Sequence, residues 1–436
     1  MNKPLRAVCC VILGVAIIVV SAFIDLRATQ GPWRDGFAFV GPSPELPELV
    51  PFVEYQPPAA ESQFAGWSSQ KILFIDFDER EWSSLVAEGK ALDLGKHEAL
   101  AGALCDLDEI DVNGQTYRVT GRMHRDVGGL SAAYVIPFDG EVTDALLIRG
   151  MASEGFYARD PQQQFSDPDY QWPEDVSPLF LHSTIPMPTG VPFAVLAGLA
   201  LTLYGAAVLQ WHAVLWLHRV SNAFDGLVTA GREHPRLFRF VHSLNYSVFL
   251  YVMFAGILSP QANLSASQWV FEAFSEGSLK DLTQAYLDRN IPLAAWETFR
   301  NNFIVQTVIM SSIPSLFIPL FGVGKTLLSL AIVGFAMAPV WSGGALPMTF
   351  HWVTIALELQ AYILVSFGIC VYTARACKAL VVLLREPDDD VPNALTEFRF
   401  GFEALASATM YACLTLAIAA LYEAITLIAL GASIAG

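Results

Sequence analysis

Charged residues are scarce in this chain. Only 15% of its 436 residues are Asp, Glu, Lys or Arg, whereas 54% are hydrophobic. A soluble globular domain usually carries about 25% charged residues. The shortage argues against a wholly soluble protein and favours a membrane protein, and the length predicts more than one domain.

Basic residues are scarcer than acidic ones. The chain has 25 Lys and Arg against 42 Asp and Glu, which gives a net charge of −17. The segment from Asp25 to Asp175 alone holds 27 acidic and 11 basic side chains, so it carries almost all of the excess. Because binding to phosphate backbones requires clustered Lys and Arg, we expect no nucleic-acid partner.

Cysteine is sparse as well. The chain has six cysteines, with no Cys-x-x-Cys pair and no Cys/His metal spacing. Cys105 is the only one in the large polar segment, where a lone cysteine cannot form an internal bridge. The other five lie in or directly after apolar runs. We therefore expect no disulfide framework, no metal and no cofactor.

Long apolar runs dominate the chain instead. The stretch from Arg300 to Val371 holds three of them almost back to back, at Phe303–Phe321, Leu327–Val340 and His351–Val371. A bilayer core about 30 Å thick takes about 20 apolar residues per helix, with ~17–25 tolerated. The turns between the runs are short and rich in Gly and Pro, so we interpret the stretch as a helical hairpin continued by a third helix.

Four further runs lie at Ala7–Ile24, Val191–Trp216, Phe240–Leu258 and Glu403–Leu430. Together with the first three they predict about seven transmembrane helices. The polar segment between the first two runs has the length of a domain. The predicted fold class is therefore a multi-pass α-helical membrane protein with an extracytoplasmic α+β domain.

The positions of Lys and Arg predict the orientation. Lys3 and Arg6 precede the first run, and four arginines lie in 218–239, so both places should face the cytoplasm. A cleaved signal peptide is the alternative for the first run, but the run is long for one and no Ala-x-Ala site follows cleanly. The predicted order is a transmembrane anchor (1–24), an acidic extracytoplasmic domain (25–187), a second transmembrane helix (188–217), a basic cytoplasmic loop (218–239) and a five-helix membrane domain (240–436).

The acidic domain should be small and mixed in structure. Asn113-Gly114 between two β-prone runs is a strong hairpin signal. Further strands are expected at 71–78, 129–138 and 144–151, and short helices at 81–89 and 97–107. The proline-rich segment 41–58 is predicted to be an extended strap outside the core, and 159–178 an irregular acidic tail.

The segment Ser259–Arg300 is too polar to span a membrane. Its aromatic and aliphatic residues recur at helical spacing, among them Trp269, Leu282 and Tyr286. We expect helices that lie flat on the outer face of the bilayer, or an amphipathic segment packed on the bundle.

The sequence Gly322-Val-Gly-Lys-Thr326 matches the end of a phosphate-binding loop. Pro319 stands where that pattern requires its first glycine, and the segment joins two membrane helices. We reject nucleotide binding and interpret Lys325 as an anchor at the cytoplasmic interface.

Two glutamates lie within apolar runs, Glu358 and Glu423, and His351 precedes Glu358 by seven residues on the same helix face. A carboxylate at bilayer depth costs ~2.5–3.5 kcal/mol on insertion scales and usually faces the bundle interior. One interpretation is a proton or cation path through these three residues. The other is that they join helices by hydrogen bonds.

Asn301 and Asn302 stand at the predicted start of the fourth helix, where asparagine side chains can bond free backbone N–H groups. Downstream lie Gly322–Gly324, Pro347 with His351 four residues later, and Glu358-Leu-Gln-Ala361. In this order, residues 240–436 resemble the stage II sporulation protein M family, a five-helix membrane domain. In that family the histidine directly follows the proline, so only Glu358 is carried over as a shared site residue.

The resemblance implies a scaffold that positions envelope proteins at the bacterial cytoplasmic (inner) membrane. No catalytic constellation stands out in the sequence, so we expect a non-enzymatic complex subunit. Its partners would be other membrane or envelope proteins and the lipid bilayer, with an oligomer as one option. The alternative is a permease subunit of an export or ion-coupled transport system that uses the membrane carboxylates.

Overall fold

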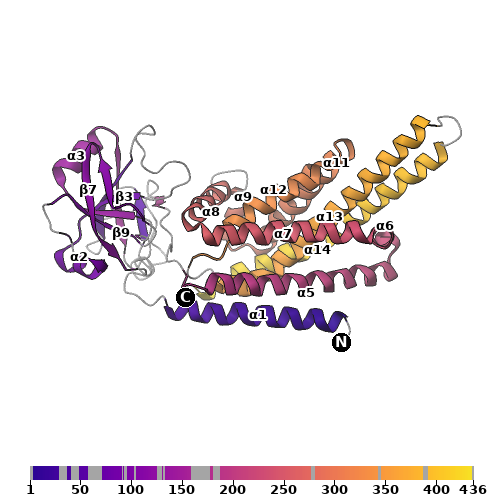
Figure 1. Cartoon of the computed structure of the whole chain (residues 1–436), viewed down its shortest axis with the longest axis horizontal. Helices are drawn as coiled ribbons and strands as arrows, with labels where there is room; N and C mark the ends of the chain where they lie inside the picture. Colours follow the sequence, from indigo (N-terminus) through magenta and orange to yellow (C-terminus); the bar gives the residue numbers. More distant parts are fainter. Residues whose placement is uncertain are drawn as a thin grey trace.

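The chain folds into a sheet domain at one end of a long helical bundle, as the computed structural model shows (Figure 1). The structure describes residues 3–28, 37–40, 49–56, 71–90, 92, 96–102, 105–124, 130, 133–158, 177–179, 187–275, 280–341, 345–385 and 391–434.

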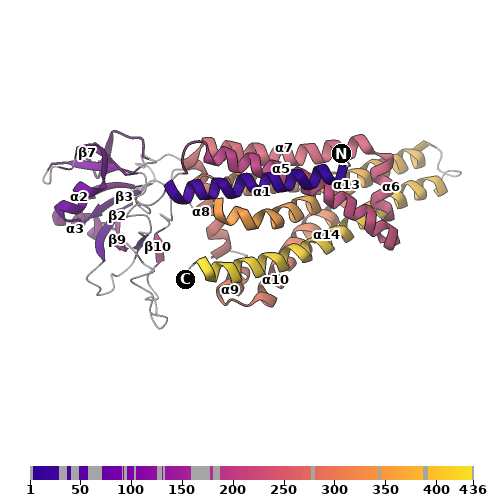
Figure 2. The ribbon, with the colours of Figure 1, turned by 90° about the horizontal axis from the view of Figure 1, so that it is seen from below.

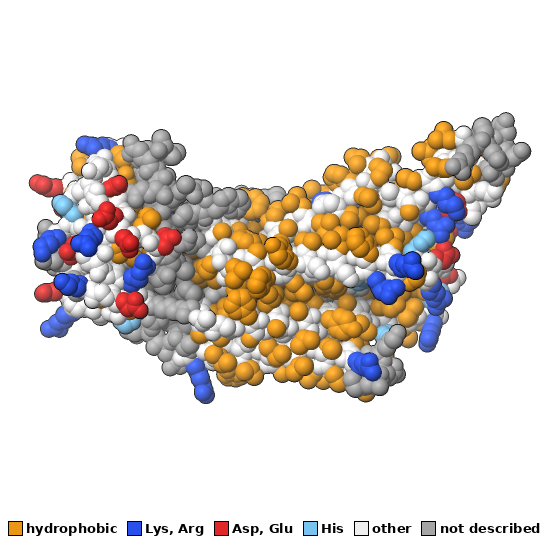
Figure 3. Space-filling model, viewed as in Figure 1, with side chains coloured by type: hydrophobic (Ala, Val, Ile, Leu, Met, Phe, Trp, Pro, Cys, Tyr) orange, Lys and Arg blue, Asp and Glu red, His pale blue; other side chains and the backbone are white. Residues whose placement is uncertain are grey.

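Five helices in these residues are long and apolar enough to cross a membrane. They are α1 (Lys3–Ala28), α5 (Val191–Val220), α7 (Pro235–Leu258), α13 (Ala345–Arg385) and α14 (Val391–Ile434). Hydrophobic side chains cover the bundle surface in a wide belt between two charged ends (Figure 3). Large exposed hydrophobic surfaces are typical of contacts with a membrane or with another protein. Together with the lengths of the helices, this belt supports a membrane protein.

Two of the predicted spanning runs do not form a single long helix. The run predicted at Leu327–Val340 corresponds to α12 (Phe321–Ala336), which has 16 residues. The run predicted at Phe303–Phe321 lies mostly in η3 (Arg300–Ser312) and α11 (Ile313–Phe317), which follow α10 (Ile291–Phe299). The backbone stays right-handed helical at both joints, so the three segments form one helical path that begins well before the predicted Phe303. A total of seven transmembrane helices requires both paths to cross the bilayer, and it stays a prediction.

The predicted loop 218–239 is mostly helical. It comprises the end of α5, then η2 (Asn222–Phe224), α6 (Asp225–Glu233) and the start of α7. α6 buries Leu227 and Val228 against the bundle. A search for spanning runs misses α6 because the helix is short and apolar on one face only.

The helices α13 and α14 extend beyond the predicted runs. α13 continues to Arg385 rather than ending at Val371, and α14 begins at Val391 rather than Glu403. The two helices therefore form a hairpin that projects past the other helices, at the end away from the sheet domain (Figure 1). The acidic segment 386–390 between them lies outside the described residues.

The first helix is a packed member of the bundle. α1 lies along α5 (Figure 2), and the two backbones approach closely at Gly14 and Gly198. A Cβ atom on Gly198 would lie 2.7 Å from the backbone oxygen of Gly14, which leaves no room for a side chain. Small residues allow such close approach between membrane helices.

The sheet domain contains β1 (Phe37–Val40), β2 (Val50–Tyr55), β3 (Lys71–Ile75), β4 (Val86–Gly89), β5 (Glu98–Ala101), β6 (Glu109–Val112), β7 (Gln115–Met123), β8 (Ala133–Pro137), β9 (Ala152–Ala158) and β10 (Ser177–Leu179), with α2 (Glu79–Leu85) and α3 (Gly140–Ile148). The strand order is β10-β1-β9-β2-β3-β8-β5-β7-β4, and β6 pairs with β7. β3 pairs in parallel with β8, and β5 with β7. The domain is thus a mixed α+β structure.

The hairpin predicted at Asn113-Gly114 is confirmed. β6 and β7 pair in antiparallel register on either side of it, and the two turn residues have φ angles of 50° and 82°. Positive φ at both positions is typical of a type I′ turn, whose twist matches that of the strands. The strands β3 and β8 also lie within their predicted ranges.

Three local predictions in this domain are wrong. The helix predicted at 81–89 ends with α2 at Leu85, and residues 86–89 form β4, which pairs with β7. Residues 98–101 form β5 rather than a helix, because β5 lies between β7 and β8 and strand pairing overrides the helix propensity of Ala and Leu. Residues 144–148 belong to α3 rather than to a strand. The carboxylate of Asp139 accepts from two backbone N–H groups of the first turn and so caps this helix.

The described part of the predicted strap belongs to the core, whereas 41–48 and 57–58 lie outside the described residues. Its residues 50–55 form β2, which lies between β3 and β9 and buries Phe52 and Val53. Alternating prolines before this strand hid its apolar character. Of the predicted acidic tail, residues 159–176 lie outside the described residues, and β10 follows them.

Both faces of the sheet are buried. α2 covers one face with Trp82, and α3 covers the other with Leu146. The segment predicted to be helical after Ser259 forms α8 (Pro260–Ser275), α9 (Lys280–Leu287) and α10. Leu264 of α8 and Trp341 pack against the face that α2 covers, so this face joins the sheet domain to the bundle.

Candidate functional site

Glu358 lies in α13 at the end of a row of amides. Asn302 of η3 donates from Nδ2 to Glu358 Oε1 at 2.6 Å, and Asn301 donates from Nδ2 to Asn302 Oδ1 at 3.0 Å. The helical path begins at Ile291, so the two asparagines are not at a helix start and the predicted capping role is wrong. Their side chains instead connect η3 to the carboxylate of α13.

The asparagines lie where the helix is widened. η3 is a π-helix, and the hydroxyls of Thr307 and Ser311 donate at 2.7 Å to the carbonyl groups five residues earlier, those of Asn302 and Gln306. π-helical turns are rare and occur frequently at functional sites. The local backbone thus places Asn302 opposite Glu358.

His351 and Glu423 meet across two helices. His351 Nε2 of α13 lies 3.7 Å from Glu423 Oε1 of α14, and their side chains are 22% and 18% exposed. His351 therefore pairs with α14 rather than with Glu358 on its own helix. Glu423 also acts electrostatically on Glu358. The structure thus brings together all five residues singled out from the sequence.

Two tyrosines and a threonine complete the cluster. Tyr286 of α9 and Tyr362 of α13 both lie within electrostatic reach of Glu358 and Glu423. The Tyr286 hydroxyl bonds Thr298 Oγ1 of α10 at 2.9 Å. Tyr362 follows Glu358 by four residues, so helical spacing could have revealed it. No sequence signal connects Tyr286 to the site.

Small apolar residues hold these elements together. Ala285 of α9, Ala294 of α10 and Ala424 of α14 form one buried group beside Glu423. Because alanine side chains are short, the three helices approach closely and bring their polar side chains within reach of one another.

The chemistry of the cluster is limited to carboxylate, imidazole, amide and hydroxyl groups. Among the described residues, no Lys or Arg forms an ion pair with Glu358 or Glu423, and no group of three or more His, Cys, Asp or Glu could hold a metal ion. The cluster can bind a proton or join helices by hydrogen bonds.

A second polar network in the bundle is closed on itself. His242 of α7 bonds the carbonyl of Phe238 through Nδ1 at 2.8 Å, so its Nε2 accepts from the amide of Gln360 at 3.0 Å. The carbonyl of Gln360 accepts from the Tyr246 hydroxyl at 3.0 Å. Each of these groups has a partner, which is what a structural link between α7 and α13 requires.

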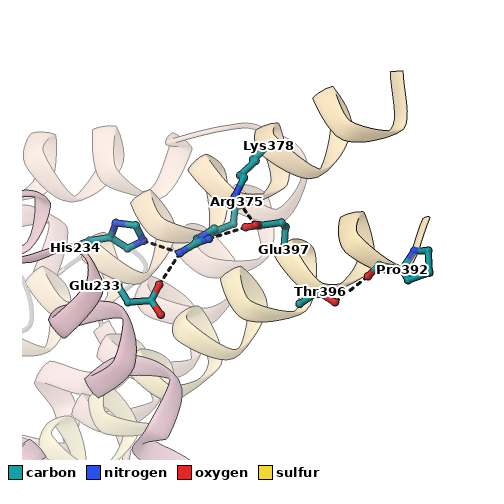
Figure 4. Close-up of polar contacts among 7 residues, drawn as sticks. All are labelled: Glu233, His234, Arg375, Lys378, Pro392, Thr396 and Glu397. Carbon is teal, nitrogen blue, oxygen red and sulfur yellow. Dashed lines mark hydrogen bonds and ion pairs between the residues drawn. The ribbon is translucent and has the colours of Figure 1, made fainter. Parts of the chain in front are cut away.

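The third polar group surrounds Arg375 at the base of the projecting hairpin (Figure 4). Its guanidinium bonds Glu397 of α14 and Glu233 of α6 at 2.7 Å each, and His234 Nε2 at 3.1 Å. It also lies 4.4 Å from the ring centre of Phe400. Arg375 thereby ties α13 to α6 and α14.

A fourth group joins the bundle to the sheet domain. Asn263 of α8 is fully buried and donates to the carbonyl of Phe335 at the end of α12. Its side-chain oxygen accepts from Trp341 Nε1 at 2.8 Å, and Trp341 packs against the sheet core. The N–H of Met187 donates to the carbonyl of Val340 at 2.9 Å.

Lys325 has a side-chain partner within the bundle, and its role as an anchor at the cytoplasmic interface stays a prediction. It lies in the first turns of α12, is partly buried, and donates from Nζ to Gln306 Oε1 of η3. The turn before α12 falls at Leu320, with φ 60°, rather than at the glycines. The Lys325 side chain therefore links two helices.

No model of a known protein family, no curated protein and no solved structure matches this chain. The resemblance to the stage II sporulation protein M family stays a prediction.

Proposed function

We propose that the chain is a non-enzymatic membrane scaffold, a subunit that holds an acidic domain in a defined position for partner proteins. The observation that carries the proposal is the attachment of the sheet domain to the bundle. Leu264 of α8 and Trp341 pack against the core of the sheet domain, and Asn263 bonds Trp341, so the two parts share a core and are not joined by a linker alone. A domain held in this way presents its surface in one orientation.

The proposed location is the bacterial cytoplasmic membrane, with the sheet domain outside. Basic side chains gather at the end of the bundle away from the sheet domain (Figure 3). Arg219 lies in the last turn of α5, Arg232 in α6, Arg236 and Arg239 in the first turns of α7, and Arg375 at the base of the projecting hairpin (Figure 4). The positive-inside rule assigns that end to the cytoplasm. Seven crossings, formed by the five long helices, the α10–η3–α11 path and α12, place the C-terminus outside.

Purification of the full chain from its native membrane in a gentle detergent tests the scaffold. We expect a stoichiometric envelope protein to co-migrate, identified by mass spectrometry. Asn263→Leu should release part of this partner because the buried carbonyl of Phe335 loses its donor. Gln284→Leu is the matched control, since Gln284 is exposed and bonds only Asp288 of the next turn. A clean homo-oligomer without a partner would contradict the scaffold.

The second candidate is a permease subunit of an ion-coupled or export system. The cluster around Glu358 and Glu423 favours it, because carboxylates within membrane helices commonly mark ion and proton pathways. Glu358→Gln distinguishes the candidates. A scaffold variant should still capture its partner, whereas ion-coupled transport should be lost. An ATPase as the sole partner would favour the export permease.

A further inference from the structure

We propose that Glu358 and Glu423 form one proton-binding site, which is loaded from the sheet-domain end of the bundle through His351. The inference deepens the second candidate function by naming the ligand and the route. It rests on the geometry of that site and does not require that anything is transported.

The first step of the argument is the charge balance. His351, which contacts Glu423 of α14, lies two helical turns before Glu358 on the same face of α13, so both carboxylates lie along the contact between these helices. Within the described residues neither is paired with Lys or Arg. The cation of η3, Arg300, is already paired with Glu297 at 2.7 Å. Two carboxylates that share an apolar site without a cation do not both stay ionised. One bound proton removes the repulsion.

The second step is the direction of the hydrogen bonds. Asn302 Oδ1 is occupied by the amide of Asn301, so Asn302 turns its N–H toward Glu358. Asn302 therefore offers no oxygen to a cation at the carboxylate. Calcium takes 6–8 oxygen ligands, and the cluster offers His351 as a nitrogen donor instead. The surroundings suit a carboxylate that gains and loses a proton better than a metal ion.

The third step is access. α13 begins and α14 ends at the sheet-domain end of the bundle (Figure 1). At 1.5 Å per residue, His351 lies about 9 Å and Glu358 about 20 Å from the start of α13, and Glu423 lies about 17 Å from the end of α14. His351 and Glu423 are partly exposed and in contact. This contact gives Glu423 a route to the sheet-domain end of the bundle through His351, and Glu358 lies deeper along α13.

The groups that face the site come from four elements. They are His351 and Tyr362 of α13, Glu423 of α14, Asn302 of η3 and Tyr286 of α9. Asn302 is a positioning residue, because it fixes one oxygen of Glu358 and leaves the other available. Proton binding at this junction can change the contacts among η3, α13 and α14.

The experiment uses N,N′-dicyclohexylcarbodiimide on the full chain in lipid vesicles. This apolar reagent modifies protonated carboxyl groups in apolar surroundings, and peptide mass spectrometry locates the adduct. We expect adduct at Glu358 or Glu423. At pH values above the pKa of the labelled carboxyl group, the yield of adduct should fall about tenfold per pH unit, because the protonated fraction falls by that factor. Glu358→Gln and Glu423→Gln should each reduce the total yield, and the double variant should abolish it.

Controls separate the site from general reactivity and from transport. Glu403→Gln should leave the yield unchanged, because Glu403 is 49% exposed and paired with Arg399. His351→Ala should slow the response of the yield to a pH jump outside the vesicles, and an unchanged rate would contradict loading through His351. No adduct at either glutamate in the unmodified chain, or protection by Na⁺ but not by choline at constant pH, would overturn the proposal. If the glutamates are labelled but the vesicles show no proton flux, the proton-binding site stands and only the transport function is refuted.

Discussion

The reactivity of Cys105 depends on whether the sheet domain is folded. It is 2% exposed in the sheet core, where it packs in the group that includes Phe74 and Tyr134. Burial raises the pKa of its thiol far above the usual range, and the nearby Asp106 carboxylate adds to this. The thiolate is the reactive form of cysteine, so Cys105 should be inert while the domain is folded.

We predict that iodoacetamide at pH 8 leaves Cys105 unmodified in the folded chain and modifies exposed Cys377. Because the folded-state pKa is raised, the thiol stays protonated up to high pH and becomes reactive only when the sheet unfolds. Mass spectrometry along a urea series measures both sites. Modification of Cys105 at the rate of Cys377 without urea would show that the sheet core is not closed.

Reasoning from single residues found Glu358, Glu423, His351 and the two asparagines, but it did not predict which of them contact one another. Glu358 and Glu423 stand out because a carboxylate is conspicuous in an apolar run, and Asn301 and Asn302 are adjacent in the sequence. The contact of His351 with α14 instead of Glu358 depends on helix packing, which no spacing within α13 reveals.

At the scale of elements, the α1–α5 pair depends on glycine. The Gly14 and Gly198 backbones leave no space for a Cβ atom between them. Gly324 in α12 has open space around the corresponding position. The two kinds of glycine allow a test in which the same methyl group is added at a closed and at an open site.

We predict that Gly198→Ala lowers stability by about 1–3 kcal/mol, as overpacking does, because α1 and α5 must move apart. Gly324→Ala should be neutral or slightly stabilising, since alanine favours helix formation. Thermal unfolding midpoints in one detergent measure both. Equal effects of the two substitutions would mean that the α1–α5 contact is not close in the folded protein.

The elements of the sheet domain were harder to predict than the membrane helices. A run of 20 apolar residues has few alternatives in a bilayer. By contrast, residues 98–101 are rich in Ala and Leu, and only their pairing with β7 and β8 makes them a strand. Short segments take their structure from neighbours that are distant in the sequence.

On the scale of the whole molecule, the two ends of the bundle are tied differently. At one end Leu264 and Trp341 pack against the core of the sheet domain. At the other, Arg375 joins α13 to Glu233 of α6 and Glu397 of α14 (Figure 4). Ion pairs centred on Arg375 therefore help to hold the base of the projecting α13–α14 hairpin.

We predict that Arg375→Ala loosens this base, because Glu233 loses its partner and Glu397 keeps only Lys378. Hydrogen–deuterium exchange should rise severalfold in α6 and in α13 beyond residue 371. Arg399→Ala is the matched control, since Arg399 is 81% exposed and surface ion pairs contribute little. Unchanged exchange in Arg375→Ala would show that α6 is held by its apolar contacts alone.

The sequence by itself determined the membrane class of the chain, the positions of its long helices, the acidic segment between the first two, and the presence of carboxylates within apolar runs. Length and hydropathy are local properties, and a bilayer admits few ways to satisfy them. Tertiary structure decided the rest: that β2 is core, that the loop after α5 contains a helix, and that Asn302 bonds Glu358 while His351 meets Glu423. These contacts join residues from 56 to 72 positions apart, and only the packing of whole helices brings them together.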